Sequence, residues 1–423
     1  MVRHACEQLA LDVSRHFQPR RKTPSNNTTT PREFPSVVSV LQATAISQVL
    51  ESFGEEEQEL VMDILSKDYD WQTAIQSSTQ SRERAFLLLD VSAVVKSHFH
   101  LQKLMPNVQL QYKVQHNRDP KLLELLGRLK VGLRTNSNLD VQAASAVKGG
   151  VVLVDDAGAT RKPNGYLRRY SKASSAPLAV DGPEEVARIH HTHERLIQRH
   201  HDDTHSLSFT LKLPRDCSKW EPLLQSTQQA CAETNTQLVG VSVDVVEEDD
   251  YLINLQESLQ RIAFEGMHVD VTGTVTQTMA PFLTGLVKSY DQVTVDASAL
   301  LVAHAGALCT RIIGVKVVGH TRHLYIDDGC YGSLCRDFKN SHQEHVPLPL
   351  FKNTAETQMT TVWGPTCDGL DRVCQNVFLP QMHVDNWLVF FDMGQSSGMG
   401  TAFNGFDPPD IVHYCVLGYS RQF

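Results

Sequence analysis

The feature that most constrains the fold of this chain is an alternation of short apolar runs with amphipathic stretches, which extends from about residue 85 to about residue 303. Apolar runs of strand length lie at residues 85–90, 108–114, 129–135, 151–156, 237–244, 267–272 and 292–296. Between them, Asp119 can cap a helix and Pro120 can occupy its first turn. Such alternation predicts parallel βα units. The number of units favours a (β/α)8 TIM-like barrel over an open sheet, although periodicity alone does not decide between the two.

The pattern changes after about residue 313, where strand-like runs follow one another closely and are separated by turn residues. This spacing is typical of an all-β domain. The predicted fold is therefore α/β, with a barrel over residues 85–303 and a sandwich-like or barrel-like β domain over residues 304–423. Residues 19–36 are rich in Pro, Ser, Thr and Asn and have no apolar period, so residues 1–36 are predicted to form a disordered arm, followed by an N-terminal segment at 37–84.

Charge and cysteine content exclude several classes of protein. The net charge of −9 argues against a nucleic-acid-binding surface. The longest apolar stretches are far too short to cross a membrane. Nine Cys residues include no CxxC pair, which indicates reduced thiols and predicts a cytoplasmic protein. His190 and His193 could share a helix face, but the sequence fixes no acidic or thiol partner for them, so no metal site is predicted.

The most unusual motif is residues 363–371, which read Trp-Gly-Pro-Thr-Cys-Asp-Gly-Leu-Asp. Gly and Pro impose a particular backbone path, and Cys367 next to Asp368 makes a reactive pair if that path is exposed. The motif resembles the active-site loop of the eukaryotic ornithine decarboxylases, a pyridoxal-phosphate (PLP) family that also contains the antizyme inhibitors. Further segments resemble this family at residues 104–117, 325–333, 379–387 and 403–406.

The resemblance implies a fold type III decarboxylase, with a PLP-binding barrel and a β-sandwich-like domain that takes in the N-terminal segment. It also implies a dimer in which the loop with Cys367 and Asp368 reaches into the partner's active site. Residues 85–90 and 104–117 resemble the family's first barrel strands.

The residue that should bind the cofactor covalently is changed. In the family, the Schiff-base Lys lies in a Tyr-Ala-Val-Lys-x-Asn segment, whereas residues 112–117 here read Tyr-Lys-Val-Gln-His-Asn. Gln115 therefore stands at the Lys position, and an amide cannot form an imine. Lys113 lies two residues earlier and, on a continuous strand, would point to the same face about 6–7 Å away.

The resemblance places the family's phosphate and pyridine contacts at positions that are also changed. Of the three glycines in the Asp-x-Gly-Gly-Gly phosphate cradle, only Gly273 remains. The family's Glu-Pro-Gly-Arg turn corresponds to residues 296–299, where Asp296 replaces Glu and Ala299 replaces the phosphate-binding Arg. Both changes weaken the compensation of the phosphate charge.

Three further positions of the implied site carry different chemistry. Asp244 stands where the family has the His that stacks on the ring, and Arg134 stands where it has an Asp. Ser396 lies where a Tyr is expected after the late Met-Gly pair. Together, these changes predict that the chain does not bind PLP productively.

A basic segment offers a candidate partner surface. By the resemblance it occupies the family's antizyme-binding region, and it contains Arg161, Lys162, Arg168, Arg169 and Lys172. A charge run is usually a solvated face, yet basic residues would also steer an acidic partner to the chain.

The resulting functional prediction is a non-catalytic regulator of polyamine biosynthesis. It would form homo- or heterodimers and act as an antizyme-inhibitor-like decoy or as a partner of active ornithine decarboxylase, in which case Cys367 and Asp368 could act in trans. The chain ends at Phe423 without the tail that directs degradation in unstable members, so slow turnover is expected. Two alternatives stay open: a divergent PLP-dependent ornithine or amino-acid decarboxylase that uses Lys113, and a structural homologue without a polyamine role.

Overall fold

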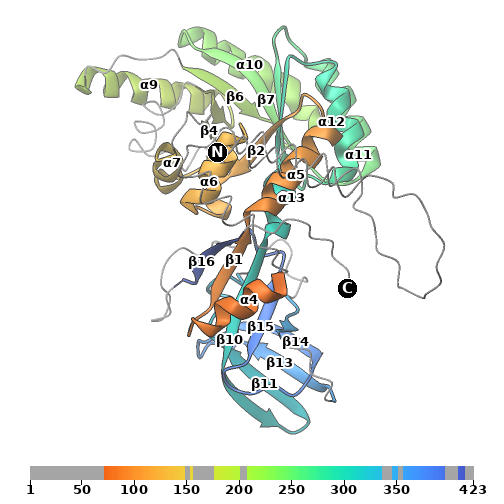
Figure 1. The fold of residues 1–423 in the computed structure, drawn as a ribbon. Coiled ribbons are helices and arrows are strands. Elements are labelled where there is room, and N and C mark those ends of the chain that lie inside the picture. The colour runs from red at the N-terminus through yellow and green to blue at the C-terminus, as the bar shows by residue number, and fades with distance from the viewer. Residues whose placement is uncertain are drawn as a thin grey trace, which may run out of the picture. The chain divides into compact units, whose positions relative to one another are not determined.

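The computed structural model describes residues 71–147, 153–155, 176–200, 207–335, 345–350, 356–395 and 408–414. All of them belong to one compact unit, Tyr69–Tyr414. Two eight-stranded sheets organise this unit (Figure 1). The predicted arm at residues 1–36 and residues 37–70 of the predicted N-terminal segment 37–84 lie outside the described residues.

The first sheet is parallel and has the strand order β4-β3-β2-β9-β8-β7-β6-β5. It curves into a TIM-like half-barrel, which confirms the predicted fold class of this part. Its strands are β2 (Gln109–Lys113), β3 (Gly132–Thr135), β4 (Leu153–Asp155), β5 (Leu178–Val180), β6 (Ser208–Lys212), β7 (Gln237–Val245), β8 (His268–Gly273) and β9 (Gln292–Asp296). The strand β6 was not predicted, because its alternating polar residues made residues 208–212 less apolar than the other runs.

Helices surround this sheet (Figure 1). They are α5 (Val91–Leu104), α6 (Pro120–Arg128), α7 (Asn138–Ser145), α9 (Pro183–His200), α10 (Trp220–Glu233), α11 (Asp249–Arg261), α12 (Ala280–Val287) and the short α13 (Ser298–Val302). Asp119 caps α6 by accepting a 2.8 Å hydrogen bond from the Leu122 backbone N–H, and Pro120 occupies the first turn. The predicted start of this helix is therefore confirmed, for the predicted physical reason.

One face of the central barrel strands is polar. The strand registers place Ser242 beside Asp270 and Asp270 beside Thr294, so the three side chains share a face. In the neighbouring registers, Asp296 pairs with Gln111 and Lys113 pairs with Arg134, which continues the same face toward β2 and β3. The intervening residues, such as Val243, Val269 and Val295, are buried on the opposite face. The polar face is unusual, since branched apolar residues normally fill a TIM-barrel interior.

The prediction that residues 85–90 open the barrel is wrong. Strand β1 (Phe86–Asp90) pairs antiparallel with β10 (Gly306–Val318) and parallel with β16 (Asp410–Tyr414), so it belongs to the second sheet. Phe86 and Leu88 pack in one apolar cluster, whereas Leu87 packs in another. A strand buried on both faces reads as a continuous apolar run in either sheet, which is why the sequence alone misassigned it.

The second sheet is mixed and confirms the predicted C-terminal β domain. Its main path is β12-β15-β10-β11-β13-β14, and β1 and β16 join it at β10. The remaining strands are β11 (Thr321–Ile326), β12 (Leu348–Pro349), β13 (Gln358–Trp363), β14 (Arg372–Leu379) and β15 (Trp387–Phe391). The helix α4 (Trp71–Gln80) precedes β1, and its residue Ile75 is buried against Phe86 and Trp387 in one apolar cluster of this sheet.

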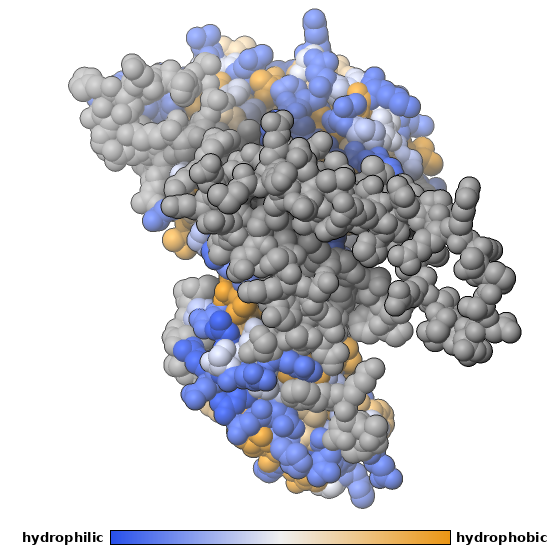
Figure 2. Space-filling model, in the orientation of Figure 1, coloured by the Kyte–Doolittle hydropathy of each residue, from blue (hydrophilic) through white to orange (hydrophobic). Residues whose placement is uncertain are grey.

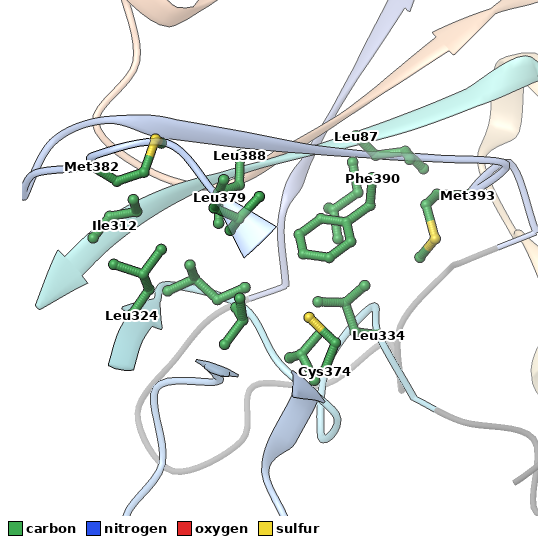
Figure 3. Packing of buried hydrophobic residues seen from close by; sticks show 14 residues of the cluster. Leu87, Ile312, Leu324, Leu334, Cys374, Leu379, Met382, Leu388, Phe390 and Met393 are labelled. Carbon is green, nitrogen blue, oxygen red and sulfur yellow. The ribbon is translucent and has the colours of Figure 1, made fainter. Parts of the chain in front are cut away.

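The larger apolar core of this domain is drawn in Figure 3. Leu87, Leu308, Leu324, Leu388 and Phe390 are nearly inaccessible to solvent and come from strands β1, β10, β11 and β15. Where Figure 2 colours the surface of one face, hydrophilic residues predominate and apolar residues are scattered among them. Such scattered apolar side chains are ordinary for a surface that faces water. Among the described helices, none is long and apolar enough to cross a membrane.

Candidate active site

The loop at residues 363–371 connects β13 to β14 and is held by one buried carboxylate. Asp371 accepts hydrogen bonds from the Thr366 backbone N–H at 3.0 Å, the Thr366 hydroxyl at 2.7 Å and the Cys330 backbone N–H at 2.8 Å. The Gly364 backbone N–H also donates to the Asp371 carbonyl at 2.8 Å. A Cβ at Gly364 would collide with the Asp371 carboxylate, so only glycine fits there.

This framework presents Cys367 and Asp368 to solvent. Tyr331 donates a short hydrogen bond to Asp368, and the Leu370 backbone N–H donates a second at 2.9 Å. The hydrogen bond from Tyr331 lowers the pKa of Asp368 most, and the bond from the Leu370 backbone N–H lowers it further. The Tyr331–Asp368 bond also raises the pKa of Tyr331 to about 12. At neutral pH the loop therefore carries an exposed thiol beside an ionised carboxylate whose conformation is fixed.

Gln115 and Lys113 do not lie on one strand, contrary to expectation. Strand β2 ends at Lys113, and Val114–His116 forms a 3-10 turn. Gln115 is exposed on this turn, and its side-chain oxygen accepts a short hydrogen bond from the Asn136 amide. The turn changes the direction of the side chains, so strand alternation cannot relate Lys113 to Gln115.

Lys113 forms an ion pair with Asp296, the last residue of β9. Their Nζ and Oδ2 atoms lie 2.7 Å apart, and the two side chains are 21% and 7% exposed. Asp296 also accepts a 2.5 Å hydrogen bond from the Ser298 hydroxyl. Burial by itself would raise the pKa of Asp296, but the charges of Lys113 and Arg134 outweigh burial, so its pKa lies below the usual value.

Arg134 is buried on β3 and binds Asp270 through both ends of its guanidinium. Nη1 lies 2.8 Å from Asp270 Oδ1, and Nη2 lies 3.0 Å from Oδ2. Asp270 also accepts hydrogen bonds from the Ser242 hydroxyl at 2.9 Å and the Thr294 hydroxyl at 2.6 Å. Arg134 further donates a short bond to Gln111. A bidentate ion pair with additional hydroxyl donors therefore crosses the polar face of the barrel.

Asp270 and Gln111 were not among the sequence-predicted site residues. A signal was present: Asp270 lies between Val269 and Val271 on an apolar strand, where a carboxylate needs a partner. Arg134 gives a similar signal, because it is a cation between Leu133 and Thr135 on a strand that is otherwise uncharged. The sequence did not show that strands β3 and β8 bring these two residues together.

Gly273, at the end of β8, has a backbone conformation and close neighbours that only glycine tolerates. Its φ of +96° is in a region that side chains disfavour, and a Cβ there would lie 2.5 Å from the Val245 carbonyl oxygen and 2.6 Å from Asp244 Oδ1. Asp244 Oδ2 accepts a 3.0 Å hydrogen bond from Arg215. Packing of β8 against β7 is therefore sufficient to account for this glycine.

Of the other predicted positions, the structure describes Ala299. Ala299 is exposed at the start of α13 and carries no charge. Ser396 lies outside the described residues, as do the basic residues Arg161, Lys162, Arg168, Arg169 and Lys172. No group of three or more His, Cys, Asp or Glu among the described residues could hold a metal ion. The His190 ring lies 3.8 Å from Glu194.

Residues 60–394 match the family described as pyridoxal-dependent decarboxylase, C-terminal sheet domain. The chain belongs to this family. It is 26% identical over 380 residues to a chloroplastic ornithine decarboxylase of Nicotiana glutinosa, a match that covers 82% of this chain and 87% of that protein.

Other relatives in this family have two different names. Antizyme inhibitor 2 of Xenopus laevis is 23% identical over 389 residues, covering 80% of this chain and 82% of the inhibitor. Ornithine decarboxylase of Mus musculus is 23% identical over 384 residues, covering 79% of this chain and 82% of the enzyme. The family therefore includes similar proteins named as enzymes and a similar protein named as an inhibitor.

Solved structures support the two-part fold. The arginine decarboxylase of Paramecium bursaria Chlorella virus superposes with a TM-score of 0.67 at 16% identity, covering 81% of this chain and all of that one (100%). The lysine/ornithine decarboxylase of Vibrio vulnificus, complexed with cadaverine, gives a TM-score of 0.67 at 16% identity, covering 80% of this chain and 97% of that one. At such identities these matches establish the fold alone.

Proposed function

We propose that this chain is a non-catalytic, ornithine-decarboxylase-like regulator of polyamine biosynthesis. The proposal is carried by Gln115, which is exposed on a 3-10 turn after β2 and which, by the resemblance, stands at the position of the imine-forming Lys. An amide nitrogen is not a nucleophile toward an aldehyde, so this position cannot hold PLP covalently. The likeness to both ornithine decarboxylases and antizyme inhibitor 2 is consistent with a regulatory member of the family.

The charged groups near the carboxyl-terminal ends of the barrel strands, here called the barrel mouth, support the absence of PLP as cofactor. Lys113 and Asp296 neutralise each other, and Arg134 is held by Asp270. Ala299 offers no charge to a phosphate group, which bears nearly two negative charges. Without the Arg that the family has at this position, a charged hydrogen bond of about 1.5–3 kcal/mol is lost. Asp244 adds a carboxylate where the family has a ring-stacking His. These residues do not fit the cofactor.

The alternative, a PLP-dependent decarboxylase that uses Lys113, requires the Lys113–Asp296 pair to break. Imine formation needs the neutral amine, whereas the adjacent carboxylate favours the ammonium ion. The absorbance band of a Lys-bound PLP imine in the purified protein would distinguish this alternative from the proposed non-catalytic function. We expect no such band, and no turnover of ornithine, lysine or arginine. A band that Lys113→Met abolishes, and that the surface control Lys103→Met leaves intact, would establish the alternative.

The regulatory role would be exerted through partners. The exposed pair Cys367 and Asp368 is ordered within its own domain, which suits donation of this loop to an active decarboxylase in a heterodimer. The basic residues of segment 161–172 suit capture of antizyme as a decoy. A co-purification experiment with antizyme and active ornithine decarboxylase separates the two forms, and recovery of neither partner favours a structural homologue without a polyamine role.

Each form has a variant that tests it. For the decoy, the double substitution Arg168→Glu and Arg169→Glu should abolish antizyme binding, and unchanged binding would exclude this form. For the heterodimer, the chain should restore activity to a decarboxylase whose own loop is disabled. Asp368→Ala should remove that restoration while dimer formation is retained. Restoration that survives Asp368→Ala would mean that the loop is only structural.

A further inference from the structure

Four neighbouring strands of the second sheet carry cations but no carboxylates. Strands β10, β11, β13 and β14 lie next to one another (Figure 1), and none of their residues is Asp or Glu. The whole chain, by contrast, has a net charge of −9. One face of these strands packs on the apolar core through residues such as Leu324 and Val362. The opposite face, here called the outer face, consists largely of half-buried and exposed residues.

The strand registers bring the side chains of the outer face together in pairs. The pairs are Lys316 with His323, Val318 with Thr321, Tyr325 with Trp363, and Met359 with Phe378. Along each strand these residues alternate with residues that pack on the core, so they project from the other face. The outer face therefore combines apolar and aromatic side chains with a lysine and a histidine.

The apolar part of the outer face is open to solvent. Phe378 is 67% exposed and Val318 is 53% exposed. Met359, which pairs with Phe378, is half-buried, as are Tyr325 and Trp363. Single exposed apolar residues are ordinary, but a contiguous patch of them usually marks a contact with another molecule. Aromatic residues and Met are enriched in the cores of protein–protein interfaces, whereas Asp and Glu are depleted there, and the outer face has this composition.

His323 supplies a hydrogen-bond donor whose direction is fixed. The Trp363 Nε1–H donates to His323 Nδ1 at 3.0 Å, and the centroids of the two rings lie 6.2 Å apart. A neutral imidazole whose Nδ1 accepts a hydrogen bond carries its proton on Nε2. Nε2 has no hydrogen-bond partner in the described part of the chain, and it is not a solvent-inaccessible atom. Its N–H can therefore be reached by a ligand on the outer face.

Lys316 lies directly across from His323 on the neighbouring strand. It is exposed, and it forms no ion pair with any residue that the structure describes. Side chains at directly opposed positions have Cβ atoms about 4.5–5.5 Å apart, so the ammonium group and the His323 N–H can bind the same carboxylate. Hydrogen bonds to an ionised group are roughly twice as strong as neutral ones. The pair therefore favours a carboxylate as its ligand.

The carboxylates that border the four strands do not fill this position. Asp327, just after β11, accepts hydrogen bonds from the backbone N–H groups of Ala85 and Arg311. Asp371, just before β14, is committed to the loop at residues 363–371. Glu356 is exposed but lies beyond the last paired residue of β13. Both donors of the Lys316–His323 pair are thus left for the carboxylate of a partner.

A protein partner fits the outer face better than a nucleic acid does. A single-stranded nucleic acid needs several cations for its phosphates and exposed rings on which its bases stack. The outer face has one exposed lysine, and of its described rings only that of Phe378 is exposed. The net charge of −9 would also repel a polyanion.

We propose that the outer face docks an acidic segment of a partner protein. A carboxylate of this segment binds Lys316 and the Nε2–H of His323. An apolar side chain next to that carboxylate packs on Phe378, Met359 and Val318. The inference does not rest on the proposed function, since it uses neither the loop with its exposed thiol nor the barrel mouth.

The test begins with a random peptide library displayed on phage. The immobilised full chain selects peptides, and the folded Phe378→Ala chain removes those that bind elsewhere. Enriched peptides should carry Asp or Glu next to an apolar residue. The affinity of a synthetic copy is then measured by isothermal titration. A copy in which Asn and Gln replace every Asp and Glu should bind at least about tenfold more weakly, and added salt should weaken the acidic copy.

Three variants locate the site. Lys316→Glu reverses the charge, and Phe378→Ala removes the exposed ring, so each should weaken the acidic peptide by about tenfold or more. Trp363→Phe keeps an aromatic ring but removes the N–H that fixes the proton of His323. It should weaken the peptide and also shift the NMR signals of the His323 ring nitrogens. If Trp363 served only for packing, neither change would occur.

Matched controls lie on the barrel. Ile253→Ala removes a side chain that is 59% exposed, and Lys130→Glu reverses the charge of an exposed lysine. Neither should change the affinity. Lys316→Glu and Phe378→Ala should keep the wild-type melting temperature, because both side chains are exposed.

The proposal is overturned if no acidic peptide is enriched, if the neutral copy binds equally well, or if folded Lys316→Glu and Phe378→Ala proteins keep full affinity. Binding of a poly(U) oligonucleotide that Phe378→Ala abolishes would also overturn it, as would a like-chain dimer that this substitution dissociates. Either result would assign the outer face to a different occupant.

Discussion

Replacing Arg134 by Met should destabilise this protein strongly, because it strands a buried carboxylate. The Arg134 side chain is 1% exposed and donates two bonds to Asp270, whose own side chain is 14% exposed. Removing one partner of a buried ion pair costs about 3–5 kcal/mol. Asp270 would retain its bonds from Ser242 and Thr294, so the lower end, about 3 kcal/mol, is expected for Arg134→Met.

The assay is urea unfolding followed by circular dichroism, with the double variant Arg134→Met and Asp270→Leu as the decisive partner. The double variant removes both charges and should lose less stability than Arg134→Met alone, since no uncompensated charge remains. A loss of stability below about 1 kcal/mol for Arg134→Met would refute the idea that the pair acts as a buried unit. So would a loss for the double variant that equals the sum of the losses of Arg134→Met and Asp270→Leu measured separately.

Three further predictions concern the second sheet and its loop. Gly364→Ala places a methyl group against the fixed Asp371 carboxylate. We expect the free energy of unfolding to fall by about 1–3 kcal/mol and proteolysis between β13 and β14 to become faster. An unchanged cleavage rate would contradict this. Burial raises the pKa of Asp327 to about 6, so the folded chain binds more protons than the unfolded chain between pH 4 and 6. Wild-type stability should therefore fall relative to Asp327→Asn as pH rises through this window, and a pH-independent difference would exclude the effect. Leu308→Ala, in the core of Figure 3, should cost about 2–5 kcal/mol by thermal unfolding, whereas the exposed control Leu370→Ala should stay within about 0.5 kcal/mol.

Local patterns were sufficient to predict much of the fold. Asp119 and Pro120 marked the start of α6 because capping and the first helical turn depend on adjacent residues alone. The assignment of β1 failed because Phe86, Leu87 and Leu88 are buried on both faces, and an apolar run carries no record of its neighbouring strands. Pairing with β10 and β16 is decided by residues more than 200 positions away.

The residues of the candidate site could be proposed from the sequence, whereas the contacts among them could not. The flanking Tyr112 and Asn117 predict that Gln115 stands at the family's imine position. The ion pair between Lys113 and Asp296 could not be predicted, because it depends on the lateral pairing of β2 with β9. The 3-10 turn after Lys113 likewise follows from how the strand ends in three dimensions, which two-residue alternation cannot express.

The loop with Cys367 and Asp368 and the mouth of the barrel are held by separate sets of contacts. Asp371 organises the loop through Thr366 and Cys330, and Tyr331 fixes Asp368, all from the second sheet and its connections. The loop framework described here makes no use of the Lys113–Asp296 pair or of Arg134. Substitutions at the barrel mouth can therefore remove cofactor chemistry without disturbing the loop. Such independence is what a chain needs if it is to offer an ordered Cys367–Asp368 pair to another subunit while lacking a working site of its own, as proposed here.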